Sequence, residues 1–237
     1  MMRIDKFVSS QKAELSRSMV KELCKKGLVT VNGAVCKKSD AKIDPENAQV
    51  CIDGELITYR KHIYIMLNKP QGVVCSTRDG DSPTVLSLVP DHLLRDGLFP
   101  AGRLDKDTEG FVLITDDGEL AHQMLAPKSH VPKKYAVTLE KPWQENYPEL
   151  FKNGIVIDGD EECLPAEFVG DTIDAHKCTL VLHEGKFHQV KRMFHALDNK
   201  VVFLKRISIG NLALDENLPL GECLEILHKD VDKLLAN

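Results

Sequence analysis

The chain has 237 residues, of which 43% are hydrophobic and 28% charged, and its formal net charge is −5. This composition is typical of a soluble globular protein and argues against a disordered or low-complexity chain. The apolar runs, such as residues 111–114 and 201–204, are too short to cross a bilayer, and charged residues occur within the first six positions. We therefore expect a cytoplasmic protein that does not associate with membranes.

The charge is unevenly distributed along the chain. Residues 1–42 contain ten Lys and Arg against four Asp and Glu, a net charge of +6, so the remaining residues carry −11. Nucleic-acid binding normally requires a basic surface, which the overall charge alone does not indicate. The basic N-terminal segment on an acidic body therefore indicates an interaction module.

Two helices are predicted in this basic segment. Residues 3–9 and residues 16–27 both have apolar side chains at helical spacing, and the second helix has Ser16 or Ser18 as a plausible N-cap and Gly27 as its stop. Its apolar face consists of Met19, Val20, Leu23 and Cys24. The opposite face is either a solvated helix surface or a phosphate-binding surface, and it carries Arg17, Lys21, Lys25 and Lys26.

A hairpin follows the helices and completes a compact first unit. Residues 28–31 read as a strand, and Asn32-Gly33 predicts a tight turn. Asp53-Gly54 marks a further turn and Arg60-Lys61 a polar joint, where this unit should end. We therefore expect a small N-terminal domain over residues 1–58, a linker over 59–62 and a larger domain over 63–237.

The larger domain mixes strands and helices. Apolar strand patterns and helical patterns follow one another without a regular alternation, which favours an α+β fold with a largely antiparallel mixed sheet flanked by helices. The expected strands are residues 63–67, 111–115, 135–139 and 178–182, and the expected helices are residues 119–125, after a lead-in at 116–118, and 190–197.

The cysteines and histidines do not form a recognisable metal or disulfide pattern. Seven cysteines are an odd number and include no C-x-x-C pair, so we expect reduced thiols. His183, His188 and His195 lack the Cys and His partners of a zinc site. We therefore predict no metal.

The densest polar string of the chain is Gly102-Arg103-Leu104-Asp105-Lys106-Asp107-Thr108-Glu109-Gly110. It lies between two glycines and leads into a buried strand, so a carboxylate in it can be held rigidly. Such a carboxylate can act as a nucleophile or as an acid and base, and a neighbouring cation favours its charged form. The alternative is a polar turn whose side chains bond their own backbone.

The string resembles the G-R-L-D-x-x-T-x-G motif of the pseudouridine synthases, in the branch that acts on ribosomal RNA and carries an N-terminal S4-type RNA-binding domain. Residues 66–73 resemble that family's opening motif, and Lys134-Tyr135 its tyrosine motif with a shortened spacer. Residues 184–194, Glu-Gly-Lys-Phe-His-Gln-Val-Lys-Arg-Met-Phe, resemble its H-Q-V-[RK]-R motif, and residues 1–42 are similar to the S4 domain. Because the motifs agree in order across nearly the whole chain, we prefer this interpretation to the simpler ones above.

The resemblance implies catalytic roles. Asp105 corresponds to the family's nucleophile, and Tyr135 to the tyrosine that stacks on the flipped uracil and is the candidate base for the proton at C5. Lys191 is the best match for the cation that pairs with the aspartate, with Arg192 as the alternative, because adjacent residues of a helix point about 100° apart. Arg103 is expected to contact RNA in the gap left by the extruded base.

Further basic and polar residues are expected to bind the substrate RNA. These residues are Lys133, Lys134, Lys186, His188, Gln189 and Arg192 in the larger domain and Arg17, Lys21 and Lys25 in the first. Leu204, Lys205 and Arg206 resemble the apolar wall and basic strand after the third motif, but each is equally compatible with ordinary core or surface. The resemblance implies no cofactor, and the expected partner of this monomeric enzyme is ribosomal RNA or a ribosome assembly intermediate.

The most specific prediction is isomerisation of a uridine in small-subunit (16S) ribosomal RNA, because residues 119–133 resemble enzymes of that branch. A large-subunit (23S) target and a catalytically inactive S4-type RNA-binding protein are alternatives. A glycoside hydrolase that pairs Asp105 with Asp107 or Glu109 is a third, although paired carboxylates usually come from separate elements.

Overall fold

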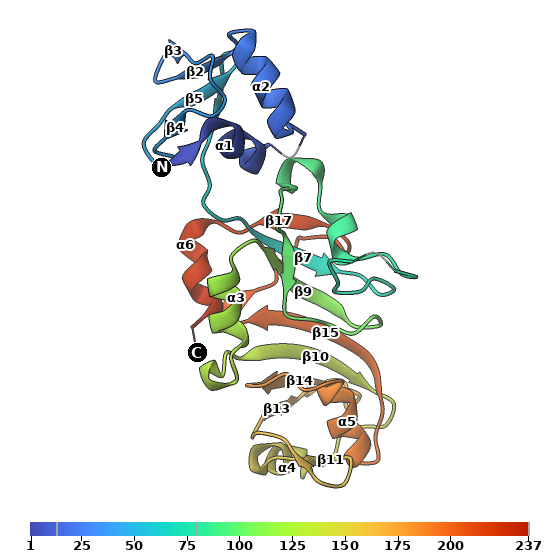
Figure 1. Cartoon of the computed structure of the whole chain (residues 1–237). Coiled ribbons are helices and arrows are strands. Elements are labelled where there is room, and N and C mark those ends of the chain that lie inside the picture. Colours follow the sequence, from blue (N-terminus) through green and yellow to red (C-terminus); the bar gives the residue numbers. More distant parts are fainter. Residues whose placement is uncertain (13, 79, 237) are drawn as a thin grey trace. The chain divides into compact units, whose positions relative to one another are not determined.

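The computed structural model describes residues 1–12, 14–78 and 80–236. By its internal contacts the chain divides into two compact units, shown in Figure 1. The first unit comprises Met1–Ile63 with Val89–Leu98, and the second comprises Tyr64–Leu88 with Phe99–Asn237. Each unit has a hydrophobic core of its own.

The first unit packs two short helices against small sheets. Its elements are β1 (Met2–Arg3), α1 (Ile4–Gln11), α2 (Arg17–Lys25), β2 (Val29–Val31), β3 (Ala34–Val35), β4 (Lys42–Ile43), β5 (Val50–Ile52), β6 (Glu55–Ile57) and the 3-10 turn η2 (Asp91–Leu93). Both predicted helices are confirmed. Ser16 caps α2, since its side chain accepts a hydrogen bond from the Met19 amide, and Val20 and Cys24 are fully buried in the core. Met19, predicted on the apolar face, is 48% exposed, because the buried stripe of α2 is narrower than its apolar pattern.

Two tight turns shape the sheet of the first unit, whose strand order is β3-β2-β5-β6. Asn32-Gly33 has positive φ at both residues (51° and 81°), as predicted for the turn that joins β2 to β3. Asp53-Gly54 has the same conformation (49° and 83°) and joins β5 to β6. The second turn therefore lies within this sheet.

The second unit is built on one large sheet. Its strands are β7 (Tyr64–Lys69), β8 (Phe99–Ala101), β9 (Glu109–Thr115), β10 (Lys133–Leu139), β13 (Glu167–Gly170), β14 (Lys177–Leu182), β15 (Val201–Ile209), β16 (Leu212–Ala213) and β17 (Cys223–Glu225). The order is β13-β14-β10-β15-β9-β7-β17, with β16 beside β15 and β8 beside β9. All of these pairs are antiparallel except β9 with β15. The predicted α+β class with a largely antiparallel sheet is confirmed.

The remaining elements flank this sheet. They are α3 (Gly118–Leu125), α4 (Tyr147–Asn153), α5 (Gln189–Ala196), α6 (His228–Val231), the hairpin β11 (Val156–Ile157) and β12 (Glu161–Glu162), and the 3-10 turns η1 (Val85–Leu88), η3 (Pro127–Ser129) and η4 (Asp232–Leu234). In the described parts of the chain, no helix combines the length and the apolar character of a membrane span.

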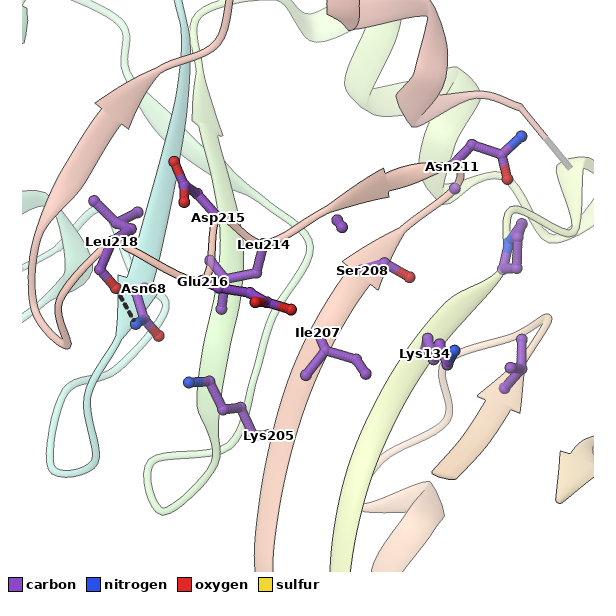
Figure 2. Close-up of a pocket in the computed structure, with 14 residues that line it drawn as sticks. Asn68, Lys134, Lys205, Ile207, Ser208, Asn211, Leu214, Asp215, Glu216 and Leu218 are labelled. Carbon is purple, nitrogen blue, oxygen red and sulfur yellow. Dashed lines mark hydrogen bonds between the residues drawn. The ribbon is translucent and has the colours of Figure 1, made fainter. Parts of the chain in front are cut away.

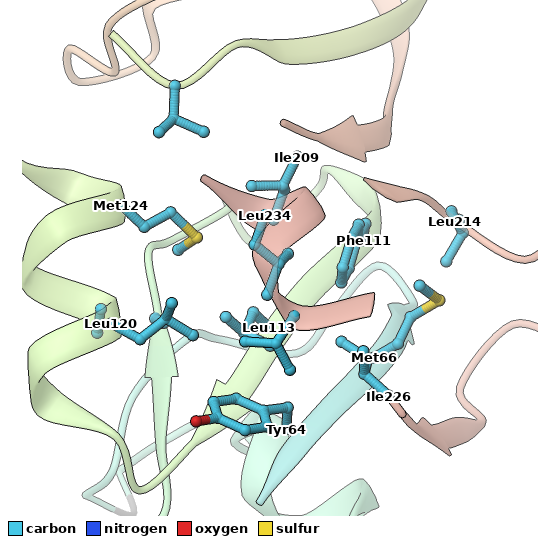
Figure 3. Close-up of a cluster of buried hydrophobic side chains, with 14 residues drawn as sticks. Tyr64, Met66, Phe111, Leu113, Leu120, Met124, Ile209, Leu214, Ile226 and Leu234 are labelled. Carbon is cyan, nitrogen blue, oxygen red and sulfur yellow. The ribbon is translucent and has the colours of Figure 1, made fainter. Parts of the chain in front are cut away.

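One face of the sheet carries the main hydrophobic core of the second unit. Figure 3 shows Phe111 and Leu113 of β9 packing with Leu120 and Met124 of α3 and with Leu234 from the C-terminal segment. Helix α3 begins where predicted, because the Asp117 carboxylate accepts hydrogen bonds from the amides of residues 119 and 120. This core fixes β9 and the loop that enters it.

The opposite face carries Lys69, Gly110, Arg206 and Tyr135, which pair directly with one another across β7, β9, β15 and β10. Residues paired in this way point to the same face of a sheet. Tyr135 also pairs with Leu180, and Leu180 with Phe168 of β13. The Phe168 ring is 6.4 Å from that of Phe194 in α5. Helix α5 is therefore anchored on the face that carries Tyr135.

Candidate active site

The loop that carries Asp105 is held in place by a buried lysine. Lys69 has no exposed surface, and its ammonium group donates hydrogen bonds to the carbonyls of Pro70 (2.9 Å), Thr108 (2.8 Å) and Lys106 (3.4 Å). Burial lowers the pKa of Lys69. This role of Lys69 was not predicted from the sequence, although a lysine at the end of an apolar strand is a detectable signal.

The glycine that closes this loop permits the parallel pairing of β9 with β15. Gly110 has φ of +101°, and a Cβ atom there would lie 2.2 Å from the carbonyl oxygen of Arg206. Only glycine fits this approach without displacing a strand. The last glycine of the G-R-L-D string is therefore a packing requirement that fixes the start of β9 next to Asp105.

Asp105 forms an ion pair with Lys191 of helix α5. The Lys191 Nζ atom is 2.9 Å from Asp105 Oδ2, and the two side chains are 25% and 24% exposed. His188, the residue before α5, has its Nε2 atom 3.5 Å from Asp105 Oδ1. The fold thus joins residues that are 86 positions apart in the sequence. Of the two cations proposed as partners of Asp105, Lys191 makes this contact.

Lys191 also holds a second carboxylate. Its Nζ atom is 2.6 Å from Asp107 Oδ1. Burial lowers the pKa of Lys191, but its hydrogen bonds to Asp107 and Asp105 outweigh that effect and the net pKa is raised. The hydrogen bond from Lys191 lowers the pKa of Asp107. From the sequence, Asp107 was a candidate only as a member of a hydrolytic pair, and this contact was not predicted.

Arg192 is engaged within the protein. Its guanidinium contacts the carboxylates of Asp158 and Glu161 and donates a 3.0 Å hydrogen bond to the Phe187 carbonyl. Lys186 is bound to Glu161 as well, at 3.2 Å. These contacts tie α5 to the β11–β12 hairpin, so any contact of Arg192 or Lys186 with RNA competes with an existing ion pair.

Gln189 is 4% exposed and braces the loop before α5 from inside. Its Nε2 donates to Glu184 (2.6 Å), and its Oε1 accepts from the Lys186 amide (2.9 Å). This burial argues against the direct RNA contact that the sequence suggested for Gln189.

Tyr135 is 8% exposed and lies in the same cross-strand row as Gly110. Between them in that row is Arg206, which is 3% exposed and donates from Nε to the Phe111 carbonyl at 2.7 Å. Arg206 is thus buried. The sequence left open whether Arg206 lies at the surface, and that possibility is wrong. Leu204 is also buried and, two positions from Arg206 on β15, shares its face. It fits the expected apolar wall.

The basic residues around Tyr135 differ in their surroundings. Lys133 donates to the Val131 carbonyl at 2.7 Å, and burial, together with the charge of Arg206, lowers the pKa of Lys133 to about 8. Arg103 and Lys134 are exposed. Lys134 lies on the face opposite Tyr135, because neighbouring residues of a strand alternate.

A pocket of about 560 Å³ lies on that opposite face (Figure 2). Lys134 and Lys205 line it together with the Asn68 amide, which donates to the Leu218 carbonyl at 2.8 Å. Neither Asp105 nor Lys191 lines this pocket. It is therefore separate from the ion pair described above.

The first unit contains a basic groove. Ten residues of β1, α1, α2 and the segment before β4 line a cavity of about 490 Å³, and six of them are Arg3, Arg17, Lys21, Lys25, Lys37 and Lys38. The three residues predicted for RNA contact in this unit, Arg17, Lys21 and Lys25, thus lie together. Lys25 is also paired with Glu22 at 2.7 Å on the exposed helix surface.

Comparison with known proteins agrees with this geometry. Residues 63–196 match the RNA pseudouridylate synthase family, and residues 2–50 match the S4 domain. The chain is 42% identical to the ribosomal small subunit pseudouridine synthase A of Haemophilus influenzae, over 99% of this chain and 100% of that protein. It is 43% identical to the protein of the same name from Vibrio cholerae, over 97% and 98% of the two chains.

A solved structure is similar throughout. A crystal structure of a pseudouridylate synthase superimposes with a TM-score of 0.68 at 39% identity, covering 99% of this chain and 100% of that one. A Bacillus subtilis protein named as an uncharacterized RNA pseudouridine synthase is 41% identical over 98% of both chains. The chain therefore belongs to the RNA pseudouridylate synthase family and carries an S4 domain at its N-terminus.

Proposed function

We propose that this protein isomerises a uridine of small-subunit (16S) ribosomal RNA to pseudouridine, with Asp105 as the nucleophile. The ion pair between Asp105 and Lys191 is the main structural support, since it presents a charged carboxylate on a rigid loop. The small-subunit target is supported by the names of the relatives that match over nearly the whole chain.

The reaction is an isomerisation, so substrate and product contain the same atoms and no oxidation or reduction occurs. The bond from N1 of uracil to C1′ of the ribose breaks, and the carboxylate of Asp105 holds one fragment covalently while the base turns. C5 then bonds to C1′, the carboxylate leaves, a proton is lost from C5 and N1 gains one. The ammonium group of Lys191 stabilises the carboxylate before attack and after release.

Tyr135 is the proposed base for the C5 proton and the proposed stacking partner of the uracil. Its place in the cross-strand row that includes Gly110 supports this role, because Gly110 closes the loop of Asp105. Leu204 supplies an apolar wall on the same face. Arg103, which is exposed in the loop before Asp105, is proposed to contact the RNA where the base has left its helix.

The first unit is proposed to bind RNA through its basic groove. The side chains of Arg17, Lys21 and Lys25 face this groove with Lys37 and Lys38, which concentrates positive charge in an otherwise acidic chain. We propose that the S4 domain spans residues 1–58 and the catalytic domain residues 63–237, with residues 59–62 as the linker. Contacts from Lys133, Lys134, Lys186 and His188 would complete the RNA-binding surface of the second unit. We further propose that the enzyme acts in the cytoplasm as a monomer, on ribosomal RNA or a ribosome assembly intermediate.

The geometry disfavours a glycoside hydrolase that pairs Asp105 with Asp107. Asp105 and Asp107 share one ammonium group, and the pKa of Asp107 is lowered by it. A hydrolytic pair needs one carboxyl group that stays protonated as a general acid, which requires a raised pKa. Asp107 does not meet that requirement.

A tritium-release assay on transcribed 16S and 23S ribosomal RNA carrying [5-³H]uridine tests the proposal. Release from the 16S transcript is expected, because the C5 proton is lost only when the new carbon–carbon bond forms. Release from the 23S transcript alone would support a large-subunit enzyme. Lack of release from both transcripts and from a small-subunit assembly intermediate would support an inactive RNA-binding protein, and free uracil would indicate hydrolysis. Chemical mapping of pseudouridine in RNA from a deletion strain then identifies the position.

A further inference from the structure

An exposed aromatic side chain lies next to the ion pair. Phe187 is 73% exposed, and its ring stacks on that of His188 with centroids 3.8 Å apart and an interplanar angle of 19°. The His188 ring in turn reaches to within 3.5 Å of the Asp105 carboxylate. The two rings therefore form a continuous aromatic surface, here called the Phe187–His188 stack, that extends from the nucleophile toward solvent.

The backbone under this stack is held in an unusual conformation. His188 has φ of 48° and ψ of 32°, which lie in the left-handed region that residues other than glycine rarely adopt. Such residues persist where surrounding contacts enforce them, and they concentrate at functional sites. Here Arg192 holds the Phe187 carbonyl from one side, and buried Gln189 holds the Lys186 amide from the other. The stack is thus preorganised before any RNA binds.

Extrusion of a uridine leaves the neighbouring base without a stacking partner. Proteins that bind unstacked nucleotides commonly cover the exposed face of a base with an aromatic side chain. Two basic side chains lie near the stack in the sequence, Lys186 just before Phe187 and Lys191 in the first turn of α5, and each is paired with a carboxylate. A large apolar ring with most of its surface in water gains most from such stacking.

We propose that the Phe187–His188 stack is a stacking platform for an RNA base next to the extruded uridine, with Phe187 as an RNA-contacting residue. The proposal rests on the proposed function. It assigns Phe187 to substrate binding during base flipping, apart from the roles of Asp105, Tyr135 and Lys191.

Variants of Phe187 test the platform in the tritium-release assay on the 16S transcript. Phe187→Ala should lower kcat/KM by at least about fivefold, the usual effect of removing one base–aromatic contact. Phe187→Tyr, which keeps an aromatic face, should stay within about twofold of wild type, and Phe187→Leu should be as defective as the alanine variant. Ile173→Ala is the matched control, because Ile173 is an apolar side chain that is 95% exposed on the β13–β14 turn; it should have no effect.

The outcomes separate the possible failures. If Phe187 merely shields His188, leucine should restore activity, and that result would overturn the platform. Wild-type kcat/KM in the alanine variant would overturn it as well. Should the alanine variant melt earlier than wild type, the comparison of leucine with tyrosine still decides. Absence of release by the wild-type chain from both the 16S transcript and a small-subunit assembly intermediate would overturn the proposed function and this inference together, whereas the Phe187 results bear on the inference alone.

Discussion

Replacing Lys69 with methionine tests how the Asp105 loop is anchored. The substitution keeps most of the side-chain volume but removes three hydrogen bonds to backbone carbonyls. The Lys106 carbonyl keeps a second partner, the Gly72 amide at 2.8 Å, so the main loss falls on Pro70 and Thr108. Two buried carbonyls without donors cost about 1–3 kcal/mol each.

Part of this loss is offset, because the lowered pKa of Lys69 shows that the buried ammonium is itself disfavoured. We therefore expect Lys69→Met to lower the free energy of unfolding by about 2 kcal/mol. Urea denaturation measures this change as a lower midpoint with an unchanged slope. Lys152→Met, at an exposed position of α4, should change stability by less than about 0.5 kcal/mol. If Lys69→Met is as stable as wild type, the lysine does not anchor the loop.

Three further predictions concern the same face of the sheet. The pKa of Lys133 is about 8 in the folded chain and near 10.5 in the unfolded chain. Between these pH values the unfolded state binds more protons, so the free energy of unfolding should rise with pH across that range. The free energies of unfolding of wild type and Lys133→Met, measured by urea denaturation, should therefore diverge there, and parallel pH profiles would contradict the assignment. Gly110→Ala should lower the free energy of unfolding by about 3 kcal/mol or more, because the added Cβ meets the Arg206 carbonyl at a residue with positive φ. An unchanged melting temperature would argue against this packing. Lys191→Met should reduce kcat/KM at least about a hundredfold by removing the partner of Asp105, whereas Lys191→Arg should retain most activity. Activity of Lys191→Met close to that of wild type would show that the charge is not needed.

Local signals predicted much of the fold. The Asn32-Gly33 turn and the cap of α2 depend on neighbouring residues; the turn appears as expected, and Ser16 is the one of the two candidate caps that is used. Helix α3 likewise follows its expected lead-in at 116–118, within which Asp117 is the cap. The antiparallel character of the sheet followed from the absence of a regular strand–helix alternation. The narrow buried stripe of α2, which leaves Met19 exposed, depends on what packs against the helix and was not readable from its periodicity.

The site was less accessible to sequence reasoning. The contact between Asp105 and Lys191 spans 86 positions, and only the resemblance to a family suggested it. The carbonyl contacts of Lys69 and the burial of Arg206 depend on tertiary packing, because charged side chains are usually expected at the surface. The second bond of Lys191, to Asp107, requires the loop and helix α5 to be placed together.

The most direct test of the central claim is a comparison of wild type with Asp105→Asn on the 16S transcript. Asparagine has nearly the same shape but is a poor nucleophile, so the variant should keep its melting temperature and RNA affinity while tritium release falls to background. Turnover by the Asp105→Asn variant close to that of wild type would contradict the assignment of Asp105 as the nucleophile.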